Sequence, residues 1–211
     1  MFRTRFLKRS SLSLASLAGM LLFLSACSSP PPPREHHYRL DIPTSATPSK
    51  AKRHRFPNDV EVARFSAKGI LSKREIIYTS PDQPLTLKQY NYHLWSESPA
   101  TLVQELLTAY LHDSNLFKRT MTSDVRNNAR YRIKGRLIRM ERMTGPSPKA
   151  TVEMELGLRD TKTRKLPLLK RYRQEELYQE DSVTAGTEAI NRATTRIFQA
   201  FAEDLRTLRW R

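Results

Sequence analysis

The 211-residue sequence predicts an α+β fold: an antiparallel or mixed β-sheet with two amphipathic helices packed on one face. Two segments, 98–113 and 182–208, repeat apolar residues at helical spacing. Residues 150–158 instead alternate apolar and polar side chains, which is typical of a strand with one buried face. Because each helix must bury its apolar stripe against such a face, we expect both helices on the same side of the sheet.

The strands expected before the first helix are short. They cover 38–42 (an edge strand), 60–65 with an irregularity at 63–64, 75–79 and 87–95. The first helix is expected to begin at Ser98-Pro99, because Ser is a favoured N-cap and Pro fits the first helical position. It is expected to end near 113–115.

The strands expected after this helix are longer and follow one another in a meander. They cover 116–122, 131–143, 150–158 and 166–178. The apolar phase shifts between Leu137 and Ile138, which predicts a β-bulge. A second helix follows from about Ser182, and we expect Leu106 of the first helix and Ile197 of the second in the core.

The N-terminus has the features of an exported lipoprotein. Basic residues at 3, 5, 8 and 9 precede an apolar run at 12–24, and small residues follow, as in a secretory signal peptide. The run is shorter than the roughly 20 residues that span a membrane. Leu24-Ser25-Ala26-Cys27 resembles the bacterial lipobox, which implies cleavage between Ala26 and Cys27 and lipidation of Cys27. An ordinary signal peptide or an N-terminal membrane anchor with a chance Cys is the alternative.

Composition divides the chain into three parts. Residues 1–26 are the expected signal peptide, and 27–57 hold the lipidated Cys and a Pro-rich, basic tether that includes the edge strand at 38–42. Residues 58–211 are expected to form a single domain. Cys27 is the only Cys, and lipidation would remove its lone thiol. Ser28 stands where an Asp would imply retention in the inner membrane, so we expect the periplasmic face of the outer membrane.

The mature protein is strongly basic. Residues 1–26 carry four basic and no acidic residues, so their removal lowers the formal charge from +16 to +12. Such a surface suits lipid head groups or an acidic protein face. Nucleic acid is not an expected partner outside the cytoplasm, and a solvated basic surface without function is the alternative.

The sequence predicts neither an enzyme nor a metal or cofactor site. The six glycines form no phosphate-binding loop or dinucleotide fingerprint, and no nucleophile elbow is present. The five histidines lack metal-ligand spacing. Glu153 and Glu155 share one side of a strand, where we expect them opposite Lys or Arg and not as a pair of catalytic acids.

Two groups of residues are candidates for contact with a partner or a lipid. Tyr90, Tyr92 and Trp95 could line a groove or an interface, or could cover the core, which the pattern favours for Trp95. Arg206, Arg209 and Arg211 form either a solvated helix end or a contact for phosphate head groups or an acidic partner.

Several motifs in order resemble one known family. They are the lipobox, Tyr38-Arg39-Leu40, Glu75-Ile76-Ile77-Tyr78, Tyr90-Asn91-Tyr92-His93-Leu94-Trp95 and Pro99 before a Leu-rich helix. This order resembles the ABC-type transport auxiliary lipoproteins, the PqiC-like family, over about residues 38–208. The chain departs from the pattern at Ser96-Glu97-Ser98 and in its basic linker at 50–55.

The resemblance implies a non-catalytic docking subunit. Family members work beside MCE-domain proteins, which carry lipids between the two membranes, and one member is thought to form a ring. The resemblance therefore implies an MCE-domain partner, a lipid anchor in the membrane and a role in membrane integrity, and it leaves homo-oligomerisation open. A structural or assembly lipoprotein of an outer-membrane complex, such as lipopolysaccharide export, is the alternative.

Overall fold

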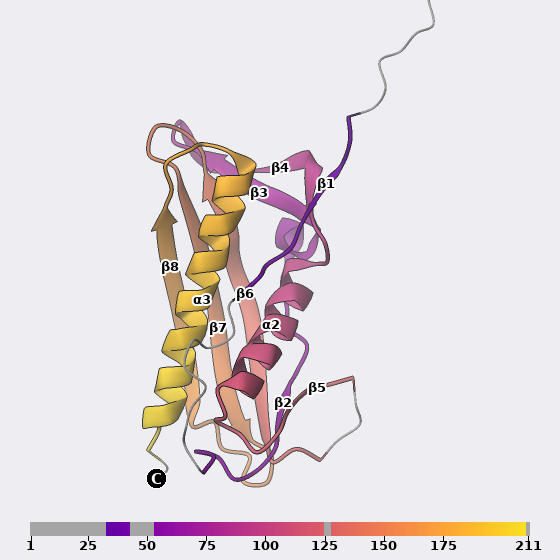
Figure 1. The fold of residues 1–211 in the computed structure, drawn as a ribbon, viewed down its shortest axis with the longest axis vertical. Helices are drawn as coiled ribbons and strands as arrows, with labels where there is room; N and C mark the ends of the chain where they lie inside the picture. The colour runs from indigo at the N-terminus through magenta and orange to yellow at the C-terminus, as the bar shows by residue number, and fades with distance from the viewer. Residues whose placement is uncertain (1–32, 43–52, 125–127, 210–211) are drawn as a thin grey trace, which may run out of the picture. The chain divides into compact units, whose positions relative to one another are not determined.

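The structure, a computed structural model, describes residues 33–42, 53–124 and 128–209. The chain divides into two units, Met1–Arg34 and Glu35–Arg211, and the fold described here is that of the second (Figure 1). Its elements are β1 (His36–Tyr38), β2 (Val60–Val62), the 3₁₀ helix η1 (Gly69–Ser72), β3 (Glu75–Ser80), β4 (Gln83–Trp95), α2 (Pro99–Asp113), β5 (Thr120–Thr122), β6 (Tyr131–Met143), β7 (Lys149–Asp160), β8 (Leu168–Leu177) and α3 (Val183–Thr207).

The sheet is mixed and is built around β6. Along one side of β6 runs β7, antiparallel, and β8 follows antiparallel to β7. Along the other side, β2 pairs with the start of β6 and β3 with its end, both in parallel. Beyond β2 lies β5, and beyond β3 lie β4 and β1. The predicted bulge in β6 is confirmed, because the register with β7 shifts between Leu137 and Arg139.

The two helices cover one face of this sheet, as predicted (Figure 1). Helix α2 lies against β2, β5 and β6, whereas α3 lies against β7 and β8. Both begin as their sequences dictate, because the side chains of Ser98 and Ser182 accept hydrogen bonds from the backbone N–H groups of Thr101 and Ala185. The α+β fold class is therefore confirmed.

The core lies between the helices and the inner face of β6, β7 and β8. The inward residues of β7 are fully buried, as their alternation predicts: Ala150, Val152, Met154, Leu156 and Leu158. On α3, Ile197 is also fully buried, which confirms its predicted place. The prediction for Leu106 is wrong in degree: it is only partly buried, because it lies at the margin of the α2 stripe and not at its centre.

The folded body begins earlier in the sequence than predicted. The first strand covers 36–38, not 38–42, and Leu40 and Ile42 after it are buried. The backbone N–H of Asp41 donates to the side chain of Asn191 on α3 over 3.0 Å. Phe56, which the sequence places in the tether, is 1% exposed and stacks on Phe117.

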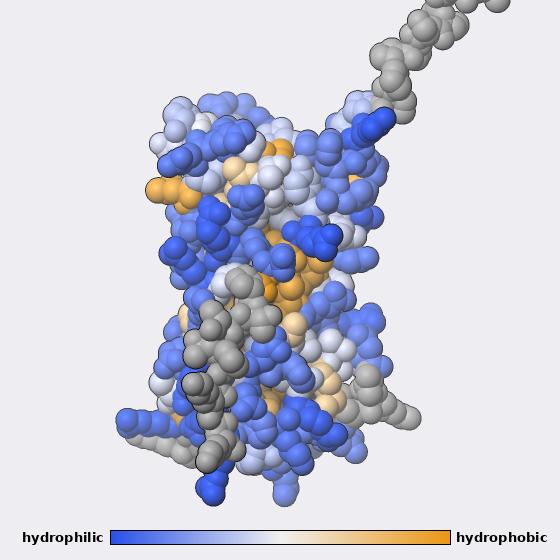
Figure 2. All heavy atoms as spheres, viewed as in Figure 1, coloured by the Kyte–Doolittle hydropathy of each residue, from blue (hydrophilic) through white to orange (hydrophobic). Residues whose placement is uncertain are grey.

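Two other boundaries also differ from the prediction. Strand β4 begins at Gln83 instead of 87, and β5 is confined to 120–122 although Leu116 and Phe117 before it are buried. The helical face of the molecule is mostly hydrophilic, with an apolar area between α2 and α3 (Figure 2). All described core residues lie between 40 and 205, so the unit Glu35–Arg211 has a complete core of its own.

Candidate functional site: the outer face of the sheet

The sheet face opposite the helices is a ladder of charged side chains. It exists because β7 alternates, so that Glu153, Glu155 and Arg159 point away from the core formed by their neighbours. Glu155 pairs with Arg136 of β6 at 3.4 Å, and Glu153 pairs with Arg171 of β8 at 3.3 Å. The expected arrangement of these glutamates opposite arginines is confirmed, although Glu153 is 6% exposed and therefore buried beneath its partners.

At one end the ladder is balanced by opposite charges. The ammonium of Lys149 donates to Glu175 over 2.8 Å. Together with the hydrogen bond from Arg173, this contact lowers the pKa of the Glu175 carboxyl. Paired charges of this kind form a stable polar surface but leave no cation free for a ligand.

At the other end the same face is hollowed into a groove of about 580 Å³. Its lining comes from β6, β7, β8 and the segments after β2 and β7: Ala63, Arg64, Ser66, Lys134, Gly135, Arg136, Glu155, Gly157, Arg159, Arg164, Leu166 and Leu169. Five of these residues are basic and one is acidic. The groove is therefore the cationic part of the outer face.

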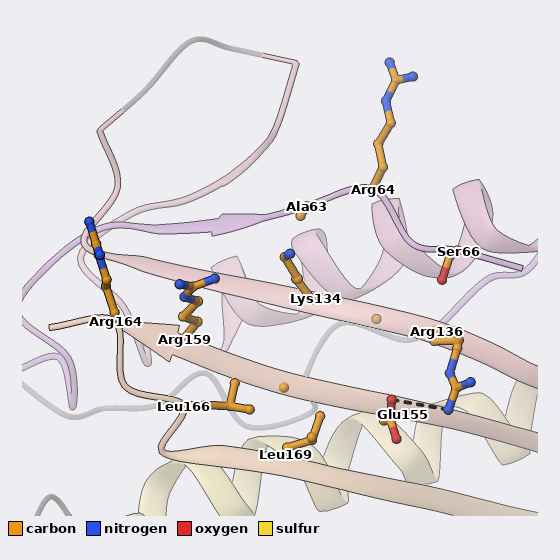
Figure 3. Close-up of a pocket in the computed structure, with 12 residues that line it drawn as sticks. Ala63, Arg64, Ser66, Lys134, Arg136, Glu155, Arg159, Arg164, Leu166 and Leu169 are labelled. Atoms are coloured by element: carbon orange, nitrogen blue, oxygen red, sulfur yellow. Dashed lines mark ion pairs between the residues drawn. The ribbon is translucent and has the colours of Figure 1, made fainter. Parts of the chain in front are cut away.

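The cations of the groove differ in how they are compensated. Arg136 pairs with Glu155, and Arg64 pairs with Asp124 at 3.2 Å and points away from the other cations (Figure 3). Lys134 and Arg159 project to the same side from neighbouring strands (Figure 3). These two and Arg164 are exposed and make no ion pair with any carboxylate in the part of the chain that the structure describes.

Two glycines shape the groove floor. A Cβ on Gly135 would lie 2.3 Å from the ring of Phe65, so only glycine lets that buried ring cross β6. A Cβ on Gly157 would lie 3.1 Å from Leu169 Cδ1 and 3.2 Å from the Leu168 carbonyl oxygen. Glycine at 157 therefore lets Leu169 lie close over β7, with Lys134 and Leu169 at the facing positions on β6 and β8.

The aromatic residues singled out in the sequence have three different environments. Trp95 is 1% exposed, which confirms its core interpretation and leaves it no surface for a partner. Tyr92 is 41% exposed and stays available for contact. Tyr90 is partly buried, lies 4.3 Å from the ring of Tyr78, and accepts a hydrogen bond from Arg142 over 3.0 Å.

Tyr90 belongs to a buried cluster around Arg142. This guanidinium is 1% exposed, donates to Tyr178 over 2.8 Å and forms an ion pair with Asp181. Burial raises the pKa of the Tyr90 hydroxyl, and the positive charge of Arg142 opposes that increase. Because Arg142 is held by groups from β4 and from the approach to α3, the cluster joins parts of the fold and offers no open site.

The arginines at the end of α3 are not brought into one site. Arg206 pairs with Glu203 at 3.2 Å within the helix, and its carbonyl accepts from Arg55 over 3.0 Å. Arg209 is exposed, and Arg211 lies outside the described residues. Ala26 and Cys27, the expected cleavage and lipidation site, also lie outside them.

The described residues show no metal centre and no membrane-spanning helix. No three His, Cys, Asp or Glu side chains among them come close enough to hold a metal ion. None of the helices described is both long and apolar enough to span a bilayer. The lining of the groove, with five basic residues beside Leu166 and Leu169, suits binding of negative charge beside an apolar edge.

Sequence reasoning missed the groove residues Lys134, Arg159 and Arg164. Alternation in 150–158 places Gly157 on the outer face, and extending it by two residues would have placed Arg159 there as well. Arg164 carried no such signal, because it lies in a turn whose course depends on Asp160 accepting from the backbone of Lys162 and Thr163.

Comparison with known proteins identifies the family. The model of the ABC-type transport auxiliary lipoprotein component matches residues 38–202. The chain belongs to this family. The match runs from the last residue of β1 to most of α3 and confirms the resemblance seen in the motifs.

Solved structures share the fold at low sequence identity. Protein XCC0632 from Xanthomonas campestris, of the family DUF330, has a TM-score of 0.69 at 16% identity, covering 81% of this chain and 95% of that chain. An uncharacterized protein has a TM-score of 0.63 at 11% identity, covering 82% and 99%. No protein with a curated description matches the sequence significantly. These structures support the architecture of this auxiliary lipoprotein and carry no statement about its ligand.

Proposed function

We propose that this protein is a non-catalytic docking subunit of an ABC-type system that moves lipid between membranes. The observation that carries the proposal is the family match over residues 38–202, which includes nearly all of the folded unit. The partner proposed is the MCE-domain protein of that system. Within this proposal the folded unit binds the partner, and its chemistry is recognition, not catalysis.

The proposed location is the periplasmic face of the outer membrane, with Cys27 as the lipid anchor. The lipobox, the single Cys and the family of lipoproteins support an anchored envelope protein. Several acyl chains, each contributing about 0.8 kcal/mol per buried CH₂, make such an anchor stable. The anchor would hold the folded unit at one membrane while it meets a partner that arrives from the other.

The basic surface supports a docking role. A mature charge of +12 attracts an acidic partner face over about one Debye length, ~8 Å at physiological salt. Complementary charge mainly raises the association rate. Tyr92, Arg206 and Arg209 are the residues from the two predicted contact groups that are exposed in the described structure, with Arg206 in its surface pair with Glu203.

Affinity purification of the full-length lipoprotein from native membranes tests this function. After chemical crosslinking, mass spectrometry should recover the MCE-domain protein, with the ABC permease and ATPase in the same sample. A Cys27→Ala form, which loses the anchor, is the matched control and should recover less of the partner. Recovery of an outer-membrane β-barrel, with no MCE-domain protein, would replace this proposal by the assembly function.

A further inference from the structure

We propose that the groove on the outer face binds the phosphate-bearing head group of an anionic lipid. Lys134, Arg159 and Arg164 contact the phosphate, and Leu166 and Leu169 contact the first carbons of the acyl chains. The inference deepens the proposed function and rests on it for the choice of a lipid over a soluble phosphate. The charge, shape and strain of the groove each support an anionic ligand.

Uncompensated positive charge in the groove favours an anionic ligand. Arg159 stands directly opposite Arg132 in the antiparallel pair of β7 and β6, and like charges at facing positions are destabilising. Arg132 is compensated by Glu61 of β2 at 3.0 Å, but Arg159 has no carboxylate partner in the described part of the chain. Lys134 is its diagonal neighbour, at the usual spacing of about 7–8 Å. A phosphate bound between Arg159 and Lys134 would offset the repulsion that Arg159 experiences. It would also accept charge-assisted hydrogen bonds from both side chains.

The groove also has a size and shape that suit a ligand. Its volume of about 580 Å³ falls within the roughly 300–1,000 Å³ typical of small-molecule sites. Gly157 is buried beneath Leu169 and Leu166, so these two leucines form the floor of the groove beside Lys134. A head group in the groove would therefore have cations on one side and leucines on the other (Figure 3).

The backbone of Arg164 is strained. Its φ of 60° lies in the left-handed region, where a side chain costs about 1–2 kcal/mol relative to glycine. Arginine at this position therefore keeps a cation at the mouth of the groove at the expense of local stability. Strain of this kind is typical of functional positions.

Two exposed leucines also favour a lipid over a soluble phosphate. Leu166 is 52% exposed and Leu169 is 58% exposed, and both line the groove beside the cations. Inorganic phosphate makes no use of apolar surface, whereas a phospholipid presents its phosphate and its acyl chains next to each other. Covering these side chains adds about 25 cal/mol for each Å² of apolar surface buried.

Titration of the unit 35–211 tests the inference, since all described core residues lie within this unit. The probes are dihexanoylphosphatidylglycerol below its micelle concentration, glycerol 3-phosphate and inorganic phosphate, measured by calorimetry. The short-chain lipid should bind at least about tenfold more tightly than either soluble phosphate. Replacing both leucines, Leu166→Ser with Leu169→Ser, should remove that preference and leave the soluble phosphates unchanged.

Matched variants separate the site from net charge. Lys134→Gln with Arg159→Gln should weaken lipid binding about tenfold or more, because charge-assisted hydrogen bonds are lost. Arg39→Gln with Lys73→Gln removes the same charge at exposed positions outside the groove and should have little effect. Arg164→Gly should also weaken binding, although its melting temperature should not fall below that of the wild type.

Three outcomes would overturn the inference. They are equal affinity for lipid and inorganic phosphate, equal losses in the groove and control variants, and no lipid binding by the wild-type unit. If the groove variants still recover the MCE-domain protein from membranes, the proposed docking function stands on its own. If the wild-type lipoprotein does not recover the MCE-domain protein from membranes, the docking function is contradicted, whatever the lipid result.

Discussion

At the scale of single residues, Arg142 explains more of this fold than any motif seen in the sequence. It lies on β6 and reaches Tyr90, Tyr178 and Asp181, which are 52, 36 and 39 positions away in the chain. A Cβ on Gly186 of α3 would lie 2.9 Å from the Arg142 side chain, so glycine there makes room for the guanidinium. These partners could not be predicted, because hydrophobic periodicity carries no information about which polar groups meet inside the core.

We expect Arg142→Gln to lower the free energy of unfolding by about 3 kcal/mol. The variant would leave Asp181 without its buried cation and remove donors from two tyrosine hydroxyls. Arg206→Gln is the control, because its pair with Glu203 is exposed and should contribute less than about 1 kcal/mol. Chemical denaturation measures both, and equal losses would show that Arg142 is not a structural centre.

His93 should make the stability of the protein depend on pH. Burial, together with the nearby His36, lowers the pKa of His93 below its ordinary value of 6.5, and Tyr38 lies within hydrogen-bond distance at 2.8 Å. The unfolded chain then binds more protons, so this stability is present above pH 6.5 and is lost as the pH falls through the folded pKa.

Denaturation at several pH values measures this effect. His93→Gln should flatten the dependence below pH 6.5, and His112→Gln, at an exposed position of α2, should leave it in place. A wild-type protein whose stability increases as the pH falls below 6.5 would contradict the role assigned to His93.

At the scale of elements, the sequence predicted the segments whose apolar residues alternate, as in a strand, or repeat at helical spacing. Both helices, their Ser caps, the long strands β6 and β7 and the bulge after Leu137 are as expected, since each has a local cause. The parallel pairing of β2 and β3 with β6 was not predicted, because strands of three to six residues carry too little pattern to choose a neighbour. The groove depends on that pairing, because residues 63–66 complete its wall.

Truncating one apolar residue on each helix should lower the free energy of unfolding by different amounts. Ile197→Ala should cost about 2–5 kcal/mol, since Ile197 is fully buried between α3 and the sheet. Leu106→Ala should cost less, because Leu106 is only partly buried. Urea unfolding of both variants checks this order, and the reverse order would contradict the packing of α3 on the sheet.

At the scale of the whole molecule, composition misplaced the start of the folded body, and the export signal that it predicts lies outside the described residues. Leu40, Ile42 and Phe56 are buried, although prolines and charges around them resemble a linker. Their burial depends on contacts with residues such as Phe117 and Asn191, which are distant in sequence. The composition shows that the chain is basic. Only the order of the strands shows which basic residues lie together in the groove.

The proposed lipid anchor concerns the whole molecule, and a single residue tests it. Cys27→Ala should abolish incorporation of labelled palmitate and leave an uncleaved or soluble precursor. Ser28→Ala is the control and should incorporate label as the wild type does. Unchanged labelling of the Cys27 variant would contradict the lipoprotein assignment.

Direct binding of the purified protein to the periplasmic part of any MCE-domain protein encoded beside it tests the central claim, the proposed docking function. At low salt we expect micromolar or tighter affinity, with an association rate that falls as salt is added. Neutralising Arg206, Arg209 and Arg211 together should lower both the association rate and its dependence on salt. We expect saturable binding, and no binding at micromolar concentration and low salt would contradict the proposed docking function.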